Sequence, residues 1–500
     1  MPELPARPDL GHLKKQAKQL LRAFRDGDPA AAARFRATVP HATGPNSTGP
    51  QLRDAQSCVA REYGFASWAA LREHVDEVRG LTMDEWLRLV YAGDTIGGTR
   101  TPRPELAVRR LADVDRAGAE RAIGLATGDV AAVRAAIAAD PGWVHRPGGP
   151  LGLAPLLAVT HSSLVRLPEF APGLRESART LLAAGADPDQ SLTTPDGHLL
   201  SALYGAAGVT HDAEMTVLLL DAGADPDDES LYHSLDGDLA CTRALLAAGA
   251  TVTGTNAMFH VADANNADAL RLLLAHGGDP NEPSPSLGTP LLFAIRRRCS
   301  AAFVRLLLDA VADPHAVTPD GVGAHRLALR LGLPEVAALL SPGDDEDDPL
   351  EDLIAACARA DAGAAKALLA ARPGLTSALD AGQRRLLPDL AGEGAADAVR
   401  AMVEAGWPID TRGGDWDATA LNHAVMRGDA ELTRFLLEHG ADPAVPHGFG
   451  DTVVGTLSWA SLNDPDSRID LVGCAQALLD HGVVPPAGYD YSDEVRAVFS

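Results

Sequence analysis

The residues of this chain that could carry out acid–base chemistry are its 16 histidines and 68 acidic residues. Histidine and aspartate are neighbours at His211-Asp212 and at Asp480-His481, and such pairs can transfer protons when a fold aims them at a substrate. With so many acids, neighbouring pairs are expected by chance. The chain contains no His-Glu-x-x-His, Gly-x-x-x-x-Gly-Lys or Gly-x-Ser-x-Gly motif and no dinucleotide-binding glycine fingerprint. We therefore expect no enzymatic activity, no catalytic residue, no cofactor and no metal.

The five cysteines are equally poor candidates for chemistry. They are scattered and odd in number, and no two have the Cys-x-x-Cys spacing of redox and zinc sites, so we expect buried thiols in a reducing compartment. The first residues, MPELPARPDL, lack the apolar core of a signal peptide, and no apolar run reaches 18 residues. These features predict a cytoplasmic protein. The cysteines are Cys58, Cys241, Cys299, Cys357 and Cys474.

One stretch, residues 419–443, shows which elements the chain is built from. It reads TALNHAVMRGDAELTRFLLEHGADP. Thr419 can cap a first helix, Gly428 ends that helix, and Asp429 can cap a second one. Gly440 follows the second helix where a left-handed residue is favoured, and the Asp-Pro pair after it prevents continuation. The stretch predicts two short helices joined by a tight turn.

Helices this short cannot stand alone. Each has about eight to ten residues, whereas isolated helices become marginally stable at roughly 12 to 15 residues. The pair must therefore stack on copies of itself. Aromatic residues make up 4% of the chain against 46% for all hydrophobic residues, so the core must consist of alanine, leucine and valine. Such a core suits closely packed short helices.

The Leu-Leu-x-x-Gly phrase at the end of this stretch recurs along the chain. Its last position provides a register with a mean spacing of 34.2 residues. Three of these positions hold Asp140, Val311 and Arg372 in place of glycine. The remaining positions are Gly185, Gly223, Gly249, Gly277, Gly343, Gly406, Gly440 and Gly482.

From its Thr-x-Leu opening to Leu-Leu-x-x-Gly-Ala-Asp, the 419–443 stretch resembles the ankyrin repeat, whose period is about 33 residues. The family's opening motif, Thr-Pro-Leu-His-x-Ala, is matched best at Thr289-Pro290-Leu291. His233 and His260 occupy the histidine position, where the resemblance implies a structural role. It also implies an all-α solenoid of stacked helix-turn-helix repeats with short β-hairpin finger loops. A count of 39 arginines to four lysines, with abundant Ala, Gly and Pro, suggests a GC-rich bacterial genome.

The first 80 residues differ from the rest. An amphipathic helix begins near Leu10, and the LKKQAKxLLRxFRxGD and AREYGFASWxxLxxHV phrases resemble a segment found ahead of ankyrin arrays in some bacterial proteins. Two interpretations stay open. The segment is either a cap that hides the apolar face of the first repeat, or a basic docking helix for nucleic acid, an anionic surface or the acidic array. The basic side chains are Lys14, Lys15, Lys18, Arg22 and Arg25.

The net charge of -25 is unevenly distributed. Residues 1–80 carry 12 basic and nine acidic residues, a balance of +3, so residues 81–500 carry -28. A body this acidic repels phosphate backbones and disfavours nucleic-acid binding over most of the chain. It favours solubility and suits a basic protein partner, and nothing indicates a membrane.

These patterns predict four regions: a helical N-terminal region over 1–80, a connecting helix and linker over 81–118, an array of about eleven repeats over 119–486, irregular near 341–372, and a C-terminal tail over 487–500. Insertions are expected as loops at 162–173 and 461–470. The acidic run 344–348 follows the register position Gly343, so it falls in a finger loop. This favours one continuous array over two domains.

In the family that the stretch resembles, finger loops and first helices line a concave face that binds proteins. Rigid aromatics and arginines there are natural binding hot spots. The candidates are Arg412, Trp416, His447 and Phe449, in the two fingers that flank residues 419–443. Alternatively, Trp416 and Phe449 only pack against the adjacent finger. We expect a non-catalytic scaffold that binds a protein partner; the alternative is a nucleic-acid-associated regulator that uses the basic N-terminal helices.

Overall fold

The chain forms two compact units, residues 1–205 and 206–500. Both are mainly helical in the described residues, and each repeating element is a pair of short helices. The structure is a computed structural model that describes residues 4, 8, 10–38, 50, 52–65, 68, 71, 74–75, 81–92, 102–114, 120–150, 152–194, 197–226, 228–342, 348–463, 469–484, 489 and 491–499.

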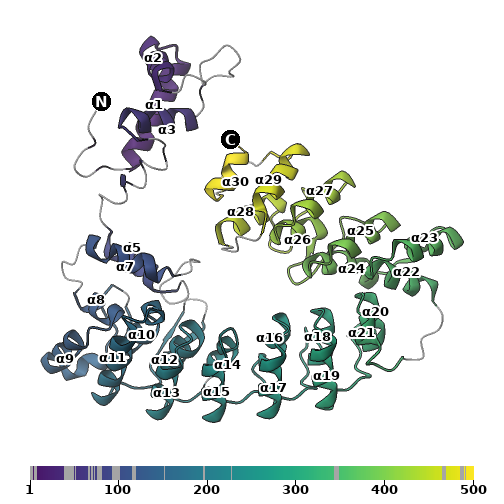
Figure 1. Cartoon of the computed structure of the whole chain (residues 1–500), viewed down its shortest axis with the longest axis horizontal. Coiled ribbons are helices and arrows are strands. Elements are labelled where there is room, and N and C mark those ends of the chain that lie inside the picture. The colour runs from purple at the N-terminus through teal and green to yellow at the C-terminus, as the bar shows by residue number, and fades with distance from the viewer. Residues whose placement is uncertain are drawn as a thin grey trace. The chain divides into compact units, whose positions relative to one another are not determined.

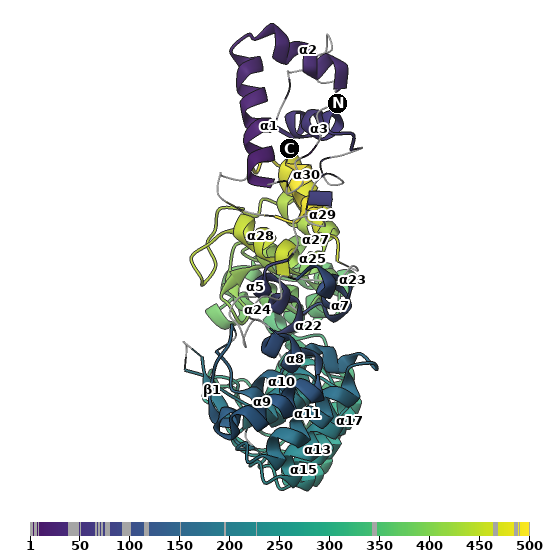
Figure 2. The ribbon, with the colours of Figure 1, turned by 90° about the vertical axis from the view of Figure 1, so that its left-hand side faces the viewer.

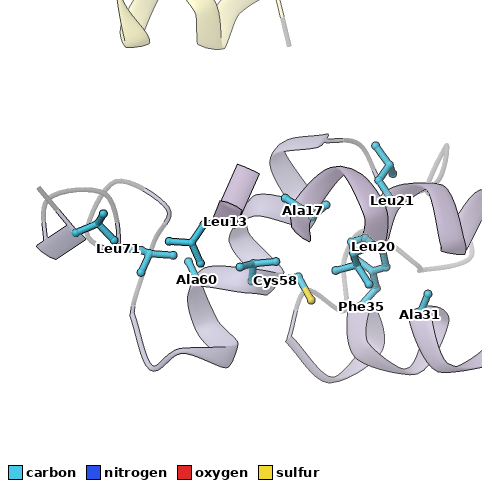
Figure 3. Close-up of a cluster of buried hydrophobic side chains, with 12 residues drawn as sticks. Leu13, Ala17, Leu20, Leu21, Ala31, Phe35, Cys58, Ala60 and Leu71 are labelled. Carbon is cyan, nitrogen blue, oxygen red and sulfur yellow. The ribbon is translucent and has the colours of Figure 1, made fainter. Parts of the chain in front are cut away.

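The first unit begins with three helices, α1 (Leu10–Arg25), α2 (Pro29–Thr38) and α3 (Leu52–Glu62), which pack on one another (Figure 2). Apolar residues three and four apart on α1 face the other two helices. The Arg34 guanidinium forms two hydrogen bonds of 2.7 Å with Glu62, which tie α2 to α3. Figure 3 shows the resulting core, which includes Leu13, Ala17, Leu20, Leu21, Ala31, Phe35, Cys58 and Ala60.

The rest of the first unit continues through short helices to a two-stranded sheet. Trp86 Nε1 donates to the Ala107 oxygen over 2.8 Å, and the Tyr91 hydroxyl donates to the Ala158 oxygen over 2.8 Å. These buried bonds fix α5 to α7 and connect the end of α5 to α10. The elements are α5 (Met83–Val90), α7 (Pro104–Arg110), η2 (Leu111–Asp113), α8 (Glu120–Thr127), α9 (Val130–Ala139), η3 (Pro141–His145), α10 (Pro155–Thr160), η4 (Ser163–Arg166), α11 (Ala171–Ala183), β1 (Ser191–Thr193), β2 (Leu199–Ser201) and α12 (Ala202–Tyr204).

The segment 162–173, expected as an insertion loop, is mostly structured. It forms the turn η4 and the start of α11, and residues 162–165 are buried. Ser162 Oγ donates to the Ala126 oxygen over 2.6 Å, and Ser163 Oγ donates to the Val90 oxygen over 2.5 Å. Burying these hydroxyls requires such partners. The insertion therefore fastens neighbouring elements together and presents little free surface.

The second unit stacks its helix pairs. Successive first helices α16, α18, α20 and α22 pack on one another, as do α24, α26 and α28 (Figure 1). From residue 205 onwards the elements are η5 (Gly205–Val209), α13 (Ala213–Asp221), α14 (Asp228–Ser234), α15 (Ala240–Ala247), α16 (Ala257–Asp263), α17 (Ala267–Ala275), α18 (Pro290–Arg296), α19 (Ala301–Asp309), α20 (Ala324–Arg330), α21 (Pro334–Ala337), α22 (Pro349–Ala358), α23 (Ala362–Ala371), η6 (Leu375–Ala378), α24 (Ala381–Gly392), α25 (Ala396–Ala405), β3 (Arg412–Gly413), β4 (Ala418–Thr419), α26 (Ala420–Met426), α27 (Ala430–Glu438), α28 (Val453–Asn463), α29 (Leu471–Asp480) and α30 (Asp493–Val498).

The second helices of many pairs begin at a capping side chain, as residues 419–443 predicted. Asp429 accepts from the Leu432 nitrogen over 2.8 Å at the start of α27, and Thr419 accepts from the Asn422 nitrogen over 3.3 Å at the start of α26. Each cap satisfies a backbone donor that a helix start leaves without an internal partner. Equivalent caps on second helices are Asp129, Asp212, Asn266, Ser300, Asp361 and Asp470.

The register positions share a left-handed backbone wherever glycine occupies them in the described residues. Their φ angles lie between +78° and +96°. Val311 adopts the same conformation, with a φ of +69°. Asp140 and Arg372 instead follow their helices with strongly negative φ angles, -156° and -138°. A proline follows each of them and disfavours helical geometry at the preceding residue. Gly343 lies outside the described residues.

Two short antiparallel hairpins, β1–β2 and β3–β4, are the sheets of the described residues. Other fingers close with a single bridge, as at Ser284–Gly288 and Val317–Gly323. The predicted fold class is confirmed, because stacked helix-turn-helix pairs with short hairpin fingers make up the array.

Stacking contacts also connect the elements on either side of the acidic run, of which residues 344–347 lie outside the described residues. Asp348 accepts from the Leu350 nitrogen over 2.9 Å at the start of α22. Arg330, at the end of α20, forms a buried ion pair with Glu351 on α22, with Nε 2.8 Å from Oε2. The Gln383 amide on α24 donates to Glu351 over 2.9 Å. Glu351 therefore joins three successive repeats.

Candidate functional site

The β3–β4 hairpin positions two of the four candidate residues. Its strands pair Arg412 with Thr419, and its turn passes through Gly414, with a φ of +71°. The Gly414 nitrogen donates to Asp389 Oδ1 on α24 over 2.6 Å, which anchors the turn to the preceding repeat. Burial raises the pKa of Asp389, and the bond from Gly414 opposes that rise.

Trp416 lies between two histidine rings from different elements. Its ring centroid is 4.9 Å from that of His423 on α26 and 5.0 Å from that of His447 in the next finger, both edge to face. The Trp416 oxygen also accepts a hydrogen bond of 3.0 Å from the Gly448 nitrogen. Edge-to-face pairs of this kind stabilise by about 0.5–1.5 kcal/mol beyond area burial. The indole ring therefore joins the two fingers.

His447 is buried and fixes the backbone of the second finger. Its nitrogen donates to the Asp451 oxygen over 2.8 Å, and the Phe449 nitrogen donates to His447 Nδ1 over 3.3 Å. Burial lowers the pKa of His447, which keeps Nδ1 available as an acceptor. The Phe449 ring lies 6.0 Å from His447 and is 82% exposed. Phe449 is thus presented to solvent from an ordered turn.

Arg412 contacts both fingers through its guanidinium group. Its Nη2 pairs with Asp417 within the hairpin, and its Nη1 donates to the Pro446 oxygen over 3.0 Å. The side chain remains 40% exposed. The structure therefore brings all four predicted residues together. Three of them are engaged in contacts between or within the fingers, and Phe449 alone of the four is largely free to touch a partner.

Two residues of the site were not singled out from the sequence, His423 and Asn422. His423 is buried under the hairpin, where its Nε2 lies 3.2 Å from the Gly413 oxygen and burial lowers its pKa. Asn422 Nδ2 donates to Thr419 over 3.0 Å, and its Oδ1 accepts from Thr456 of the next repeat over 2.8 Å. Asn422 occupies the histidine position of the resembled Thr-Pro-Leu-His-x-Ala motif, and His423 is the next residue. A histidine displaced by one position from the motif is the signal that could have identified both residues.

A cavity of about 1250 Å³ lies within the second unit. Its walls come from α16, α18, α20, α24, α26 and the β3–β4 turn. Trp416 and His423 line it, whereas Arg412, His447 and Phe449 do not. Charged side chains of both signs face the cavity: Asp263, Arg296, Arg297, Asp320, Arg330, Arg385, Asp389, Glu393, Asp415 and Arg427.

The five basic residues predicted for docking all lie on α1 and are exposed: Lys14, Lys15, Lys18, Arg22 and Arg25. Arg22 has Asp26 at 4.0 Å, a contact too exposed to stabilise much. A docking role for this face stays a prediction.

His260 has its own partners inside the array. Its Nε2 lies 2.7 Å from Asp236 Oδ1, and its ring stacks on Tyr232 with centroids 4.1 Å apart. Over the described ranges, no group of three histidine, cysteine or acidic side chains is arranged to hold a metal ion. Nor does any helix in that part of the chain have the length and apolarity to span a membrane.

The elements from the end of α24 through α27 contain the β3–β4 hairpin with Arg412 and Trp416, whereas His447 and Phe449 lie in the finger after α27. Residues 387–437 match the ankyrin repeat family. This match covers the β3–β4 hairpin and most of the 419–443 stretch, and ankyrin repeats are generally protein–protein interaction modules. No curated protein matches the chain.

Solved ankyrin repeat domains are similar to part of the chain. One from Acinetobacter baumannii is 26% identical, covers 34% of this chain and 92% of its own, and has a TM-score of 0.30. The ankyrin repeat domain of Bcl-3, a member of the IκB family, is 21% identical over 50% of this chain and 97% of its own, with a TM-score of 0.23. The ankyrin repeat domain of human ASB11 is 22% identical over 46% of this chain and 99% of its own, with a TM-score of 0.22.

Proposed function

We propose that this chain is a non-catalytic scaffold that binds a protein partner through its finger loops and concave face. The observation that carries the proposal is Phe449, which is 82% exposed at the end of the ring series His423, Trp416 and His447. The Phe449 backbone is fixed in the turn by its hydrogen bond to His447, so little backbone freedom is lost when the exposed ring is buried by a partner, and buried aromatic rings are typical binding hot spots.

The charge of the array favours a basic partner. Residues 81–500 carry -28, and such a field accelerates the approach of positively charged proteins. We infer a cytoplasmic location from the five free and buried cysteines, since free thiols are typical of a reducing compartment. The arginine-rich composition supports a bacterial source.

A quantitative pull-down from an extract of the source cells tests the proposal. We expect Phe449→Ala to lose at least one partner that the wild type retains, with a loss in affinity of roughly fivefold or more for a hot-spot residue. Val472→Ala is the matched control, because Val472 is an exposed apolar residue on the second helix α29, outside the fingers. Retention of every partner at the wild-type level by folded Phe449→Ala would refute a finger-loop site.

A further inference from the structure

Arg297 makes a contact that a linear stack of repeats does not require. It follows α18, and its guanidinium reaches three carboxylates: Nε lies 2.7 Å from Asp263, Nη1 3.1 Å from Glu393 and Nη2 2.7 Å from Asp415. Asp263 belongs to the neighbouring α16. Glu393 directly follows α24 and Asp415 lies in the β3–β4 turn, 96 and 118 residues further along the chain.

Repeats in a solenoid normally contact only their sequence neighbours. The stacking neighbours of α18 are α16 and α20, and α22 follows before α24 (Figure 1). The Arg297 ion pairs therefore pass over two helix pairs and join opposite walls of the 1250 Å³ cavity, which Asp263, Arg297, Glu393 and Asp415 all line.

The surroundings of Arg297 make these ion pairs stronger than ordinary surface pairs. The Arg297 side chain is 25% exposed, and its guanidinium carbon lies 4.9 Å from the centre of the Phe293 ring. Burial opposes the charged guanidinium, but Asp415, Asp263 and Glu393 together raise the pKa of Arg297 above its ordinary value. The partial burial of Arg297 reduces the screening of its ion pairs by salt. The pair with Asp415 is screened more than the others, because the Asp415 side chain is 68% exposed.

We propose that Arg297 is an electrostatic latch that holds the α16–α18 wall against the α24–hairpin wall and so sets the width of the cavity between them. A stack of repeats bends more easily than a packed globular core, because each repeat touches only its neighbours. Loss of the latch therefore opens the cavity without unfolding the repeats. This proposal does not depend on whether Phe449 binds a partner.

The distance between two spin labels measures the opening in the full chain. Asp309→Cys on α19 and Glu404→Cys on α25 place labels at exposed positions on helices that pack against α18 and α24, and the native cysteines are all buried. We expect Arg297→Gln to shift the distance distribution to longer values and to broaden it. High salt should move the wild type in the same direction and change Arg297→Gln less.

Two further variants keep the test decisive. Arg296→Gln removes the same charge from the same helix end. Arg296 forms no ion pair with the described residues and acts on Asp320 and Asp389 only at longer range, so its distribution should shift far less than that of Arg297→Gln. Glu393→Gln with Asp415→Asn leaves Arg297 and Asp263 paired and should reproduce the opening even if Arg297→Gln folds poorly. An unchanged distribution in that double variant, or an equal shift in Arg296→Gln, would overturn the latch.

Discussion

The Trp416 ring meets the His447 ring edge to face at 5.0 Å, and the Trp416 oxygen accepts a hydrogen bond from Gly448, the residue after His447. Two fingers on either side of one helix pair are thereby fixed to each other through ring and backbone contacts. This relationship divides the predicted binding residues into a supporting group and one presented ring. The supporting residues determine how Phe449 is held.

Trp416→Ala and Phe449→Ala should therefore have different effects on stability. Trp416 is half-buried between two rings, so its truncation should cost roughly 1–3 kcal/mol, less than the roughly 3–5 kcal/mol of a fully buried tryptophan. Phe449→Ala should stay within about 0.5 kcal/mol, as exposed substitutions usually do. Denaturant unfolding of both variants checks this. Equal losses would show that Phe449 is a packing residue.

Val311→Gly should stabilise the protein. Val311 has a φ of +69° and is 79% exposed, so the wild type bears a left-handed strain without burying the valine side chain. Relief of roughly 1–2 kcal/mol of strain exceeds the extra backbone entropy that glycine loses, about 0.5–1 kcal/mol. We expect a higher denaturation midpoint. Ala310→Gly, at the neighbouring residue with a φ of -87°, should lower the midpoint. A lower midpoint for Val311→Gly would contradict the assigned backbone.

Gly440→Val should have the opposite effect. Gly440 has a φ of +87°, and a Cβ added there meets nothing within 4 Å, so the cost is backbone strain alone. We expect a loss of roughly 1–2 kcal/mol. Gly440→Asn should lose less, because asparagine tolerates the left-handed region better. If Gly440→Val melts like the wild type, the end of α27 is wrongly placed.

His423 should make the protein less stable in mild acid. Burial lowers the pKa of folded His423 below the value of about 6.5 for an unfolded chain. Above that value neither state carries the proton. As the pH falls below about 6.5, the unfolded state binds a proton that the folded state does not yet bind. The free energy of unfolding therefore decreases until the pH reaches the folded-state pKa.

His423→Gln removes this proton uptake while an amide can still donate to the Gly413 oxygen. Between about pH 7.5 and about pH 5.5, its free energy of unfolding should therefore fall less than that of the wild type. Burial also lowers the pKa of His447, which both proteins retain, so the difference isolates His423. Identical pH dependence in the two proteins would exclude His423 as the cause.

The local elements were predictable because their signals are local. Thr419 and Asp429 cap the helices that their types predicted, and the register glycines adopt the left-handed backbone expected at helix ends. Prolines explain the exceptions at Asp140 and Arg372. Val311 could not be predicted to share the glycine conformation, since its side chain opposes it and only the surrounding fold enforces it.

Contacts distant in sequence were not predictable. No sequence pattern around Arg297 indicates a contact with Asp415, 118 residues away, because only the path of the array brings the two residues together. The sequence placed Trp416 and Phe449 in neighbouring fingers but could not tell which ring would pack and which would be exposed. That distinction depends on contacts between the two fingers, in which Trp416 meets the His423 and His447 rings and accepts a hydrogen bond from Gly448.

The most direct test of the binding account is photo-cross-linking in cells from a photoreactive phenylalanine analogue at position 449, with the analogue at position 472 on α29 as the control. The account predicts a discrete cross-linked protein adduct from position 449 that is absent from position 472. It further predicts that Trp416→Ala weakens this adduct by loosening the finger. No adduct from position 449, or the same adduct from both positions, would contradict a finger-loop binding site.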